Sequence, residues 1–293
     1  MKQLFLSVLG LSFGQEAFCQ TAEPPAPNAA LLALEKQVLY HPRKYDPAVM
    51  KKFTDRGGKR LDYQTAQGAQ SAWLIPAAKN DVSGKLWLIC GGNGTLAMEM
   101  EALCRGLPFP NDTFLLVDYP GYGECKGEPS PVSIRENLKS AVLLAAKHLS
   151  IEPAQIPQRV CTFGHSLGCA AALLAVDEFK LQAAVLCAPF TSTMEMARDK
   201  FNLPLDFPLQ HKFDNRTGMN VLSKNGGHAW IFHGDADNVI PVAMSQTLAK
   251  EFKDIVNLTI VPSGRHADIL RIAATGLVQA MTDARKIIPP QKR

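Results

Sequence analysis

The fold class can be predicted from residues 160–172, which read VCTFGHSLGCAAA. This stretch passes from an apolar run, through a Gly-His-Ser-Leu-Gly pentapeptide at 164–168, into small residues that open a helical pattern. A serine at a sharp turn between a buried strand and a helix has an exposed hydroxyl. Gly164 and Gly168 suit such a turn, because side chains there would collide across it. We therefore predict a strand–turn–helix unit with Ser166 as a candidate nucleophile.

Short, mainly apolar runs without polar alternation recur before and after this unit, as expected for strands buried on both faces of a sheet. Helical patterns separate most of them, which indicates an α/β fold with a mostly parallel sheet and helices on both faces. Two alternating runs, 59–65 and 70–75, predict an N-terminal antiparallel hairpin and bring the sheet to eight strands. The apolar runs are residues 86–90, 114–119, 160–164, 184–187, 229–233 and 258–261.

One helix carries a clear start signal. Ser133 is followed three residues later by Glu136, which is the spacing of a capping box. The apolar residues that follow have helical spacing, so we predict that this helix begins at Ser133.

Residues 28–290 are interpreted as one domain, because the alternation of strands and helices runs through them without an internal repeat. The interval 191–227 interrupts that alternation and carries several Met, Phe and Leu residues. Two interpretations stay open: a helix with a packed loop, or a small cap-like insertion whose apolar side chains shape a substrate pocket. Substrate choice is expected to depend on this interval.

The N-terminus has the pattern of a secretory signal peptide. Lys2 precedes an apolar run over residues 4–13, and small and polar residues follow. The run is too short to span a bilayer, and its neighbours make Cys19 a poor lipidation site. We predict a signal peptide over 1–22 and a stiff linker over 23–27, hence a periplasmic or secreted protein without a lipid anchor or a stable membrane span.

The composition indicates which kinds of molecule this protein is expected to bind. Of the 293 residues, 46% are hydrophobic and 20% are charged, with a formal net charge of +4. Lys and Arg are scattered, so we expect no nucleic-acid partner. Several cysteines, among them Cys90, Cys161 and Cys187, fall in apolar runs and are expected to be buried free thiols. Their spacing does not fit a zinc site, and no metal or organic cofactor is expected.

A serine nucleophile needs a general base, and the base needs an orienting carboxylate. At a nucleophile of this kind the chain order is Ser, then acid, then His. His266 is the last histidine and follows the run 258–261, so it is the candidate base. Asp235 and Asp237 both follow the run 229–233, and spacing alone leaves both open as the acid. The histidines that bracket this run are interpreted as structural.

The negative oxygen of a tetrahedral intermediate is usually held by two backbone N–H groups. One is expected from Leu167, which directly follows the candidate nucleophile. The other is expected from the glycine-rich loop 91–94, where Gly92 is the first choice and Asn93 the second.

Five features between residues 59 and 285 resemble the α/β-hydrolase superfamily, in particular its lipase- and esterase-like members, which are also similar to serine aminopeptidase-type hydrolases. These features are CGGNG at 90–94, DYPGYG at 118–123, GHSLG at 164–168, HGDADNVIP at 233–241, and His266.

The resemblance implies the α/β-hydrolase fold and selects between the two candidate acids. In this superfamily the acid lies three residues after the His-Gly pair, which is Asp237 here. The segment 118–123 is implied to form a loop that supports the active site. Cys90 and Cys125 are departures, because many relatives have a histidine and a serine at these positions.

The predicted function is the hydrolysis of carboxylic esters through an acyl-enzyme on Ser166, with a small-molecule substrate. An amidase or aminopeptidase with the same three residues is the first alternative. An aminopeptidase would need an acidic group near the pocket, for which the candidates are Glu99, Glu101, Glu124 and Asp206. A non-catalytic binding protein is the second alternative, although it would not need Ser, Asp and His in this order.

Overall fold

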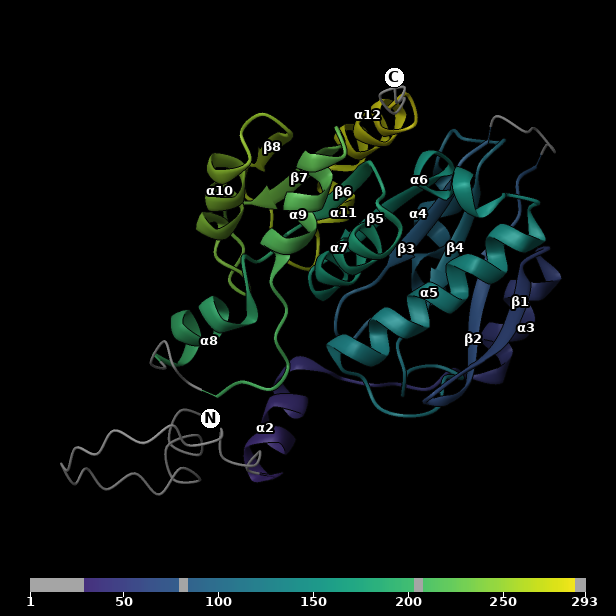
Figure 1. Cartoon of the computed structure of the whole chain (residues 1–293), viewed down its shortest axis with the longest axis horizontal. Coiled ribbons are helices and arrows are strands. Elements are labelled where there is room, and N and C mark those ends of the chain that lie inside the picture. The colour runs from purple at the N-terminus through teal and green to yellow at the C-terminus, as the bar shows by residue number, and fades with distance from the viewer. Residues whose placement is uncertain (1–28, 79–83, 203–207, 288–293) are drawn as a thin grey trace.

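The computed structural model describes residues 29–78, 84–202 and 208–287. The predicted signal peptide (1–22) and linker (23–27) lie outside the described residues. Within these ranges eight strands form one sheet, in the order β1-β2-β4-β3-β5-β6-β7-β8 (Figure 1). The strands are β1 Lys59–Thr65, β2 Gly68–Ile75, β3 Leu86–Cys90, β4 Thr113–Val117, β5 Val160–His165, β6 Ala183–Cys187, β7 His228–Gly234 and β8 Val256–Val261.

Helices cover both faces of this sheet. The helices are α2 Ala29–Leu39, α3 Pro47–Asp55, α4 Glu101–Gly106, α5 Pro131–His148, α6 Ile156–Arg159, α7 Leu167–Phe179, α8 Thr193–Phe201, α9 Asn215–Lys224, α10 Val242–Glu251, α11 Ile269–Ile272 and α12 Ala274–Ala284, with 3₁₀ turns at Ala97–Met100 and Pro153–Gln155. In Figure 1, α5, α7 and α9 lie side by side in front of the sheet. On the opposite face, Phe53 of α3 contacts Trp73, and Cys161 of β5 lies against the carbonyl of Ala284 in α12. The predicted α/β class and eight-stranded sheet are confirmed.

The antiparallel pairing is confirmed and extends further than a hairpin. β2 is antiparallel to β1 on one side and to β4 on the other, while the neighbouring pairs from β4 to β8 are parallel. β4 ends at Val117, two residues before the predicted end. Asp118 leaves the strand because its carboxylate accepts hydrogen bonds from the backbone N–H of Ala97 and from Trp73.

The helix predicted to begin at Ser133 is α5, and its predicted start is wrong by two residues. α5 begins at Pro131, and its N-cap is Ser130, whose hydroxyl accepts the N–H of Ser133 at 3.0 Å. Proline suits the first helical position because its fixed φ is helical and the missing N–H is not needed there. Glu136 instead accepts the N–H of Ala66 in the β1–β2 turn.

The core lies between the sheet and its two helical layers. Every residue of β3, β4 and β6 is buried, which agrees with apolar runs that lack polar alternation. The same prediction is wrong for β8, which lies at the edge of the sheet and exposes Thr259. The six cysteines in the described ranges are all buried free thiols. Burial raises the pKa of the Cys161 thiol to about 12, so this group is unreactive at neutral pH.

The interval 191–227 contributes two helices with different roles. α9 belongs to the layer in front of the sheet, where Gly218 lies so close to Leu173 of α7 that an added Cβ would approach it to 2.6 Å. α8 stands apart from that layer, at the end of the molecule where α2 also lies (Figure 1).

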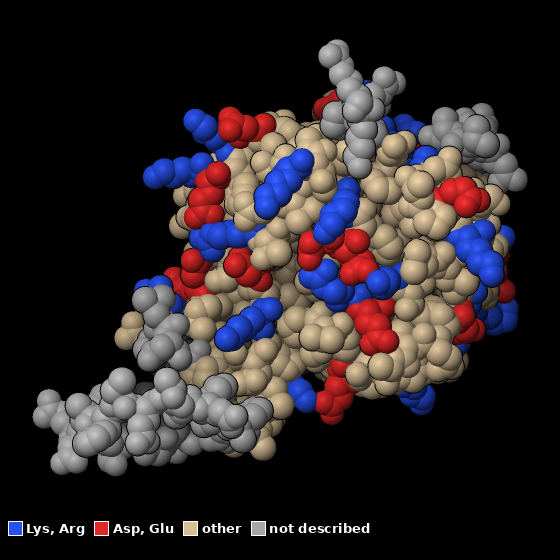
Figure 2. All heavy atoms as spheres, in the orientation of Figure 1, with Lys and Arg blue, Asp and Glu red and all other residues tan. Residues whose placement is uncertain are grey.

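Positive and negative side chains are interspersed on the face seen in Figure 2. Within the described ranges, none of the helices combines the length and the apolar character needed to cross a bilayer.

Candidate active site

Ser166 stands on a strained turn between β5 and α7, as predicted. Its backbone has φ 57° and ψ −124°, a conformation that side chains rarely adopt. An added Cβ at Gly164 would lie 2.4 Å from the carbonyl oxygen of Gly168, and one at Gly168 would lie 2.1 Å from that of Cys90. The two glycines are therefore required by backbone packing, and the turn directs the Ser166 hydroxyl away from the sheet.

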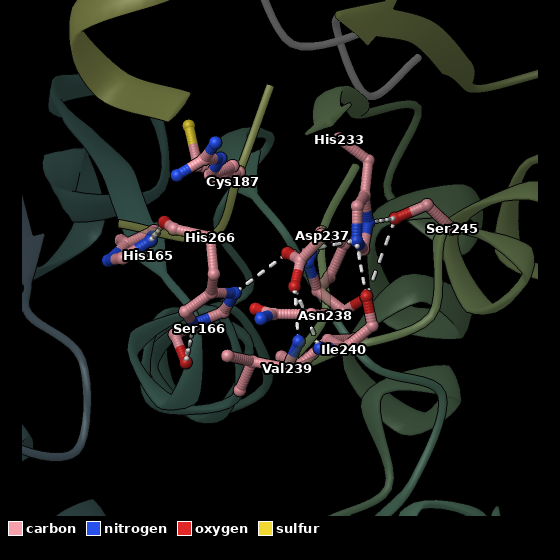
Figure 3. A network of polar contacts seen from close by, with 12 residues as sticks. His165, Ser166, Cys187, His233, Asp237, Asn238, Val239, Ile240, Ser245 and His266 are labelled. Atoms are coloured by element: carbon pink, nitrogen blue, oxygen red, sulfur yellow. Dashed lines mark hydrogen bonds and ion pairs between the residues drawn. The ribbon is translucent and has the colours of Figure 1, made fainter. Parts of the chain in front are cut away.

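His266 joins Ser166 to Asp237. The Nε2 atom of His266 lies 2.9 Å from Ser166 Oγ, and its Nδ1 atom lies 2.7 Å from Asp237 Oδ2 (Figure 3). A carboxylate can only accept, so Nδ1 carries the proton and Nε2 of the neutral ring is free to accept from the serine hydroxyl. The structure thus brings together the three residues that the sequence proposed from three different loops.

Asp237, and not Asp235, is the carboxylate that meets His266. Its side chain is 1% exposed, and its Oδ1 accepts the backbone N–H groups of Val239 and Ile240. Burial alone would raise the pKa of Asp237, but hydrogen bonds from His233, His266 and Ile240 outweigh burial and hold the pKa well below its usual range. Asp235 accepts the N–H of Ser263 instead.

His233 supports this carboxylate from behind. It is fully buried, and its Nε2 atom lies 3.0 Å from the carbonyl oxygen of Ile240 and 3.4 Å from Asp237 Oδ2. Its Nδ1 atom lies 2.6 Å from Ser245 Oγ (Figure 3). Since carbonyl and carboxylate oxygens accept, Nε2 carries a proton and donates. Ser245 Oγ also lies 3.4 Å from the carbonyl oxygen of Pro189.

His165 holds the backbone of the loop that carries His266. Its Nε2–H donates to the carbonyl oxygen of His266 at 3.0 Å, and the two rings lie 5.0 Å apart. Burial, together with the neighbouring His266, lowers the pKa of His165 to about 4. The His165 ring is therefore neutral near pH 7 and places no positive charge beside His266.

The residues predicted for the oxyanion site lie near Ser166. An added Cβ at Gly92 would lie 3.4 Å from Ser166 Cβ, which shows how closely this backbone approaches. Asn93 and Leu167 line the same cavity as Ser166. Leu167 is the first residue of α7, where backbone N–H groups have no partner within the helix.

The loop 118–123 lies against this glycine-rich loop, as the resemblance implied. The Tyr119 hydroxyl donates to the carbonyl of Gly91 at 2.7 Å, and the Tyr122 hydroxyl donates to that of Asn93. Both rings are at most 2% exposed, so the two bonds are shielded from water. The thiol of Cys125, which follows this segment, lies 3.4 Å from the carbonyl of Ser71 in β2.

An apolar cavity of about 240 Å³ opens beside the Ser166 hydroxyl. Its walls come from the active-site loops, from α8 and from α2. The lining residues are Glu35, Val38, Leu39, Asn93, Ser166, Leu167, Phe190, Thr193, Met196, Ala197, Lys200, Phe201, Leu209, Val239 and Ile240.

Three of the four acidic residues considered for an aminopeptidase lie in the described ranges and do not line this cavity. Glu99 pairs with Arg43 at 2.8 Å, Glu101 pairs with Arg105, and Glu124 lies 3.9 Å from Arg60. Asp206, the fourth candidate, lies outside the described residues.

Three features of the site were missed from the sequence. His165 and His233 stand inside motifs that were recognised, but a motif does not show what its neighbours contact. The third feature is the role of helix α2, in which Leu31, Glu35 and Val38 have the spacing of one helical face.

No family model matches the chain. Among curated relatives, YfhR of Escherichia coli strain K12 is 29% identical over 223 residues, which cover 74% of this chain and 72% of the relative. Human alpha/beta hydrolase domain-containing protein 17B is 26% identical over 210 residues, 70% of this chain and 68% of the relative.

Solved structures with the same architecture include an alpha-beta hydrolase from Vibrio vulnificus, with a TM-score of 0.65 and 17% identity over 89% of this chain and 98% of that one. The Pyrococcus furiosus esterase Pf2001 has a TM-score of 0.61 and 16% identity, over 85% of this chain and 97% of that one. The chain therefore has the α/β-hydrolase fold, and the resemblance predicted from its sequence is confirmed.

Proposed function

We propose that the protein is a serine hydrolase that cleaves carboxylic esters through an acyl-enzyme on Ser166. The observation that carries this proposal is the continuous chain of hydrogen bonds from Ser166 through His266 to Asp237, which opens onto an apolar cavity. Structural neighbours include esterases, which supports hydrolysis of a small-molecule ester. In this proposal His266 is the base and Asp237 the orienting acid.

The proposed reaction has two halves. In the first, Ser166 Oγ attacks the acyl carbon while His266 Nε2 takes the hydroxyl proton, and His266 then gives that proton to the departing alcohol. In the second, His266 takes a proton from water, the hydroxide attacks the acyl carbon, and the carboxylic acid leaves as Ser166 recovers its proton. The negative charge on Asp237 stabilises the His266 imidazolium that forms in each half.

The oxygen that becomes negative in each half is proposed to be held by backbone N–H groups of Leu167 and of Gly92 or Asn93. Such preorganised donors are worth about 10²–10³ in rate per N–H group. The bonds from Tyr119 and Tyr122 to the carbonyls of this loop support the proposal, because they fix the backbone before substrate arrives.

An ester is favoured over an aminoacyl substrate by the charges at the cavity. Among the lining residues of the described ranges, Glu35 is the one carboxylate, and its oxygens already accept the backbone N–H groups of Gln210 and His211. A substrate ammonium group would therefore find no uncommitted carboxylate among these lining residues.

The test is a panel of nitrophenyl esters of increasing acyl length, assayed beside aminoacyl anilides. We expect turnover of the esters by the wild-type protein and none above background by Ser166→Ala. Faster turnover of the anilides would favour the aminopeptidase, and a folded wild-type protein that turns over neither class would favour the binding protein.

Export is a second proposal, supported by the sequence of residues 1–22 alone. Mass spectrometry of the mature protein from periplasm or medium should show a new N-terminus between residues 15 and 23. An intact Met1 N-terminus on protein retained in the cytoplasm would contradict it.

A further inference from the structure

The N-terminal helix α2 forms one wall of the cavity beside Ser166. Glu35, Val38 and Leu39 of α2 line the cavity, and residues of α8 line it as well. In Figure 1 the two helices lie near each other, away from the helical layer in front of the sheet. Part of the wall thus comes from a segment more than 120 residues before the candidate nucleophile in the chain.

α2 is held there by an apolar cluster separate from the main core. Leu31 and Leu209, which are 4% and 7% exposed, form its centre. Apolar side chains of α2 and α8 pack around them, namely Leu34, Val38, Met194, Ala197 and Phe201. A helix this short is stabilised mainly by burial of its apolar face. Packing in this cluster therefore keeps α2 at the cavity.

Polar contacts fix the position of α2. The Glu35 carboxylate accepts the N–H groups of Gln210 at 3.0 Å and His211 at 2.9 Å. The Tyr40 hydroxyl lies 2.9 Å from Nδ1 of His211. Glu35 is 3% exposed, and a buried carboxylate is tolerated when its oxygens are bonded in this way. Its charge is therefore committed to the backbone.

The same segment is bonded to the loop proposed to hold the oxyanion. The N–H of His41 donates to the Asn93 carbonyl at 3.0 Å and to the Tyr122 hydroxyl at 2.8 Å. Arg43 donates to the Gly94 carbonyl at 2.9 Å. The position of the wall and the position of this loop are thus coupled through residues 40–43.

We propose that α2 is the specificity-determining wall for the acyl part of the substrate, which is an apolar chain of medium length. A cavity of about 150 Å³ can hold a benzene molecule, so the cavity of about 240 Å³ has room for an acyl group somewhat larger than that. This inference rests on the proposed ester hydrolysis. It assigns chain-length selection to α2, in addition to the interval 191–227 expected from the sequence.

The test compares two substitutions in α2. Val38→Phe places a ring in the cavity, whereas Ala33→Phe adds the same ring on the exposed side of the helix. For nitrophenyl octanoate we expect Val38→Phe to lower kcat/KM about tenfold or more, while the acetate ester stays within about threefold of wild type. Ala33→Phe should leave both values near wild type.

The inference would be overturned if Val38→Phe changed kcat/KM equally for the acetate and octanoate esters, or changed neither value. Either result would leave the proposed ester hydrolysis intact. A binding measurement makes the test independent of turnover. Octanamide should bind the Ser166→Ala protein in calorimetry, and the added Val38→Phe change should weaken that binding about tenfold or more. Binding that Val38→Phe leaves unchanged would also overturn it, even for a protein that hydrolyses no ester.

Discussion

His165 should make the stability of the fold depend on pH below neutrality. Burial and the neighbouring His266 lower its pKa from 6.5 to about 4 in the folded protein. Between pH 6.5 and pH 4 the unfolded chain binds a proton at His165 that the folded protein does not bind. The contribution of this group to stability is therefore fully present above pH 6.5 and falls as the pH decreases. The contribution of this one group to the free energy of unfolding falls by about 2 kcal/mol between pH 7.5 and pH 5.

The variant that isolates this effect is His165→Gln, because glutamine keeps an N–H donor for the His266 carbonyl but does not titrate. Urea unfolding at pH 7.5 and pH 5 should show that the wild-type protein loses about 2 kcal/mol more than the variant between the two conditions. His148→Gln is the matched control, because His148 is exposed. Equal losses for wild type and His165→Gln, within about 0.5 kcal/mol, would refute the reasoning.

Three further substitutions test the site and its support. Asp237→Asn should lower kcat/KM for the best ester by about 10³–10⁴-fold, because His266 loses its orienting carboxylate. Asp235→Asn is the control, and similar losses for both variants would contradict the assignment of Asp237 as the acid. Gly168→Ala should lower the Tm, because the new Cβ would lie 2.1 Å from a carbonyl oxygen. Gly106→Ala is the control, because its Cβ would meet nothing within 4 Å. An unchanged Tm for Gly168→Ala would contradict this account of the turn. His233→Leu should cost about 1–3 kcal/mol of unfolding free energy in urea, because it removes the hydrogen bond that the buried ring donates to the Ile240 carbonyl. A loss below about 0.5 kcal/mol would show that the buried ring is dispensable.

The parts of the fold that the sequence predicted are those that local patterns determine. The buried strands could be recognised because sheet residues covered on both faces must be apolar along their whole length. The turn at Ser166 could be recognised because backbone packing excludes every side chain from two of its positions, and glycine is the visible result. His266 and Asp237 followed from chain order and from the resemblance.

The parts that were missed depend on contacts between distant segments. Nothing local in His165 indicates that its ring would meet the carbonyl of a residue 101 positions later. Leu31, Leu34 and Val38 of α2 have helical spacing, but their partner Leu209 is separated from them by most of the chain. The start of α5 was misplaced for a different reason. Ser133 and Glu136 have the spacing of a capping box, but the N-cap is Ser130 and Pro131 takes the first helical position.

The central claim is that Ser166 is a nucleophile activated by His266. The most direct test is to treat the folded protein with a fluorophosphonate probe and to locate the adduct by peptide mass spectrometry. The account predicts one adduct per chain on the peptide that contains Ser166, and no labelling of folded Ser166→Ala. A folded wild-type protein that stays unlabelled, or a Ser166→Ala variant that labels like wild type, would contradict it.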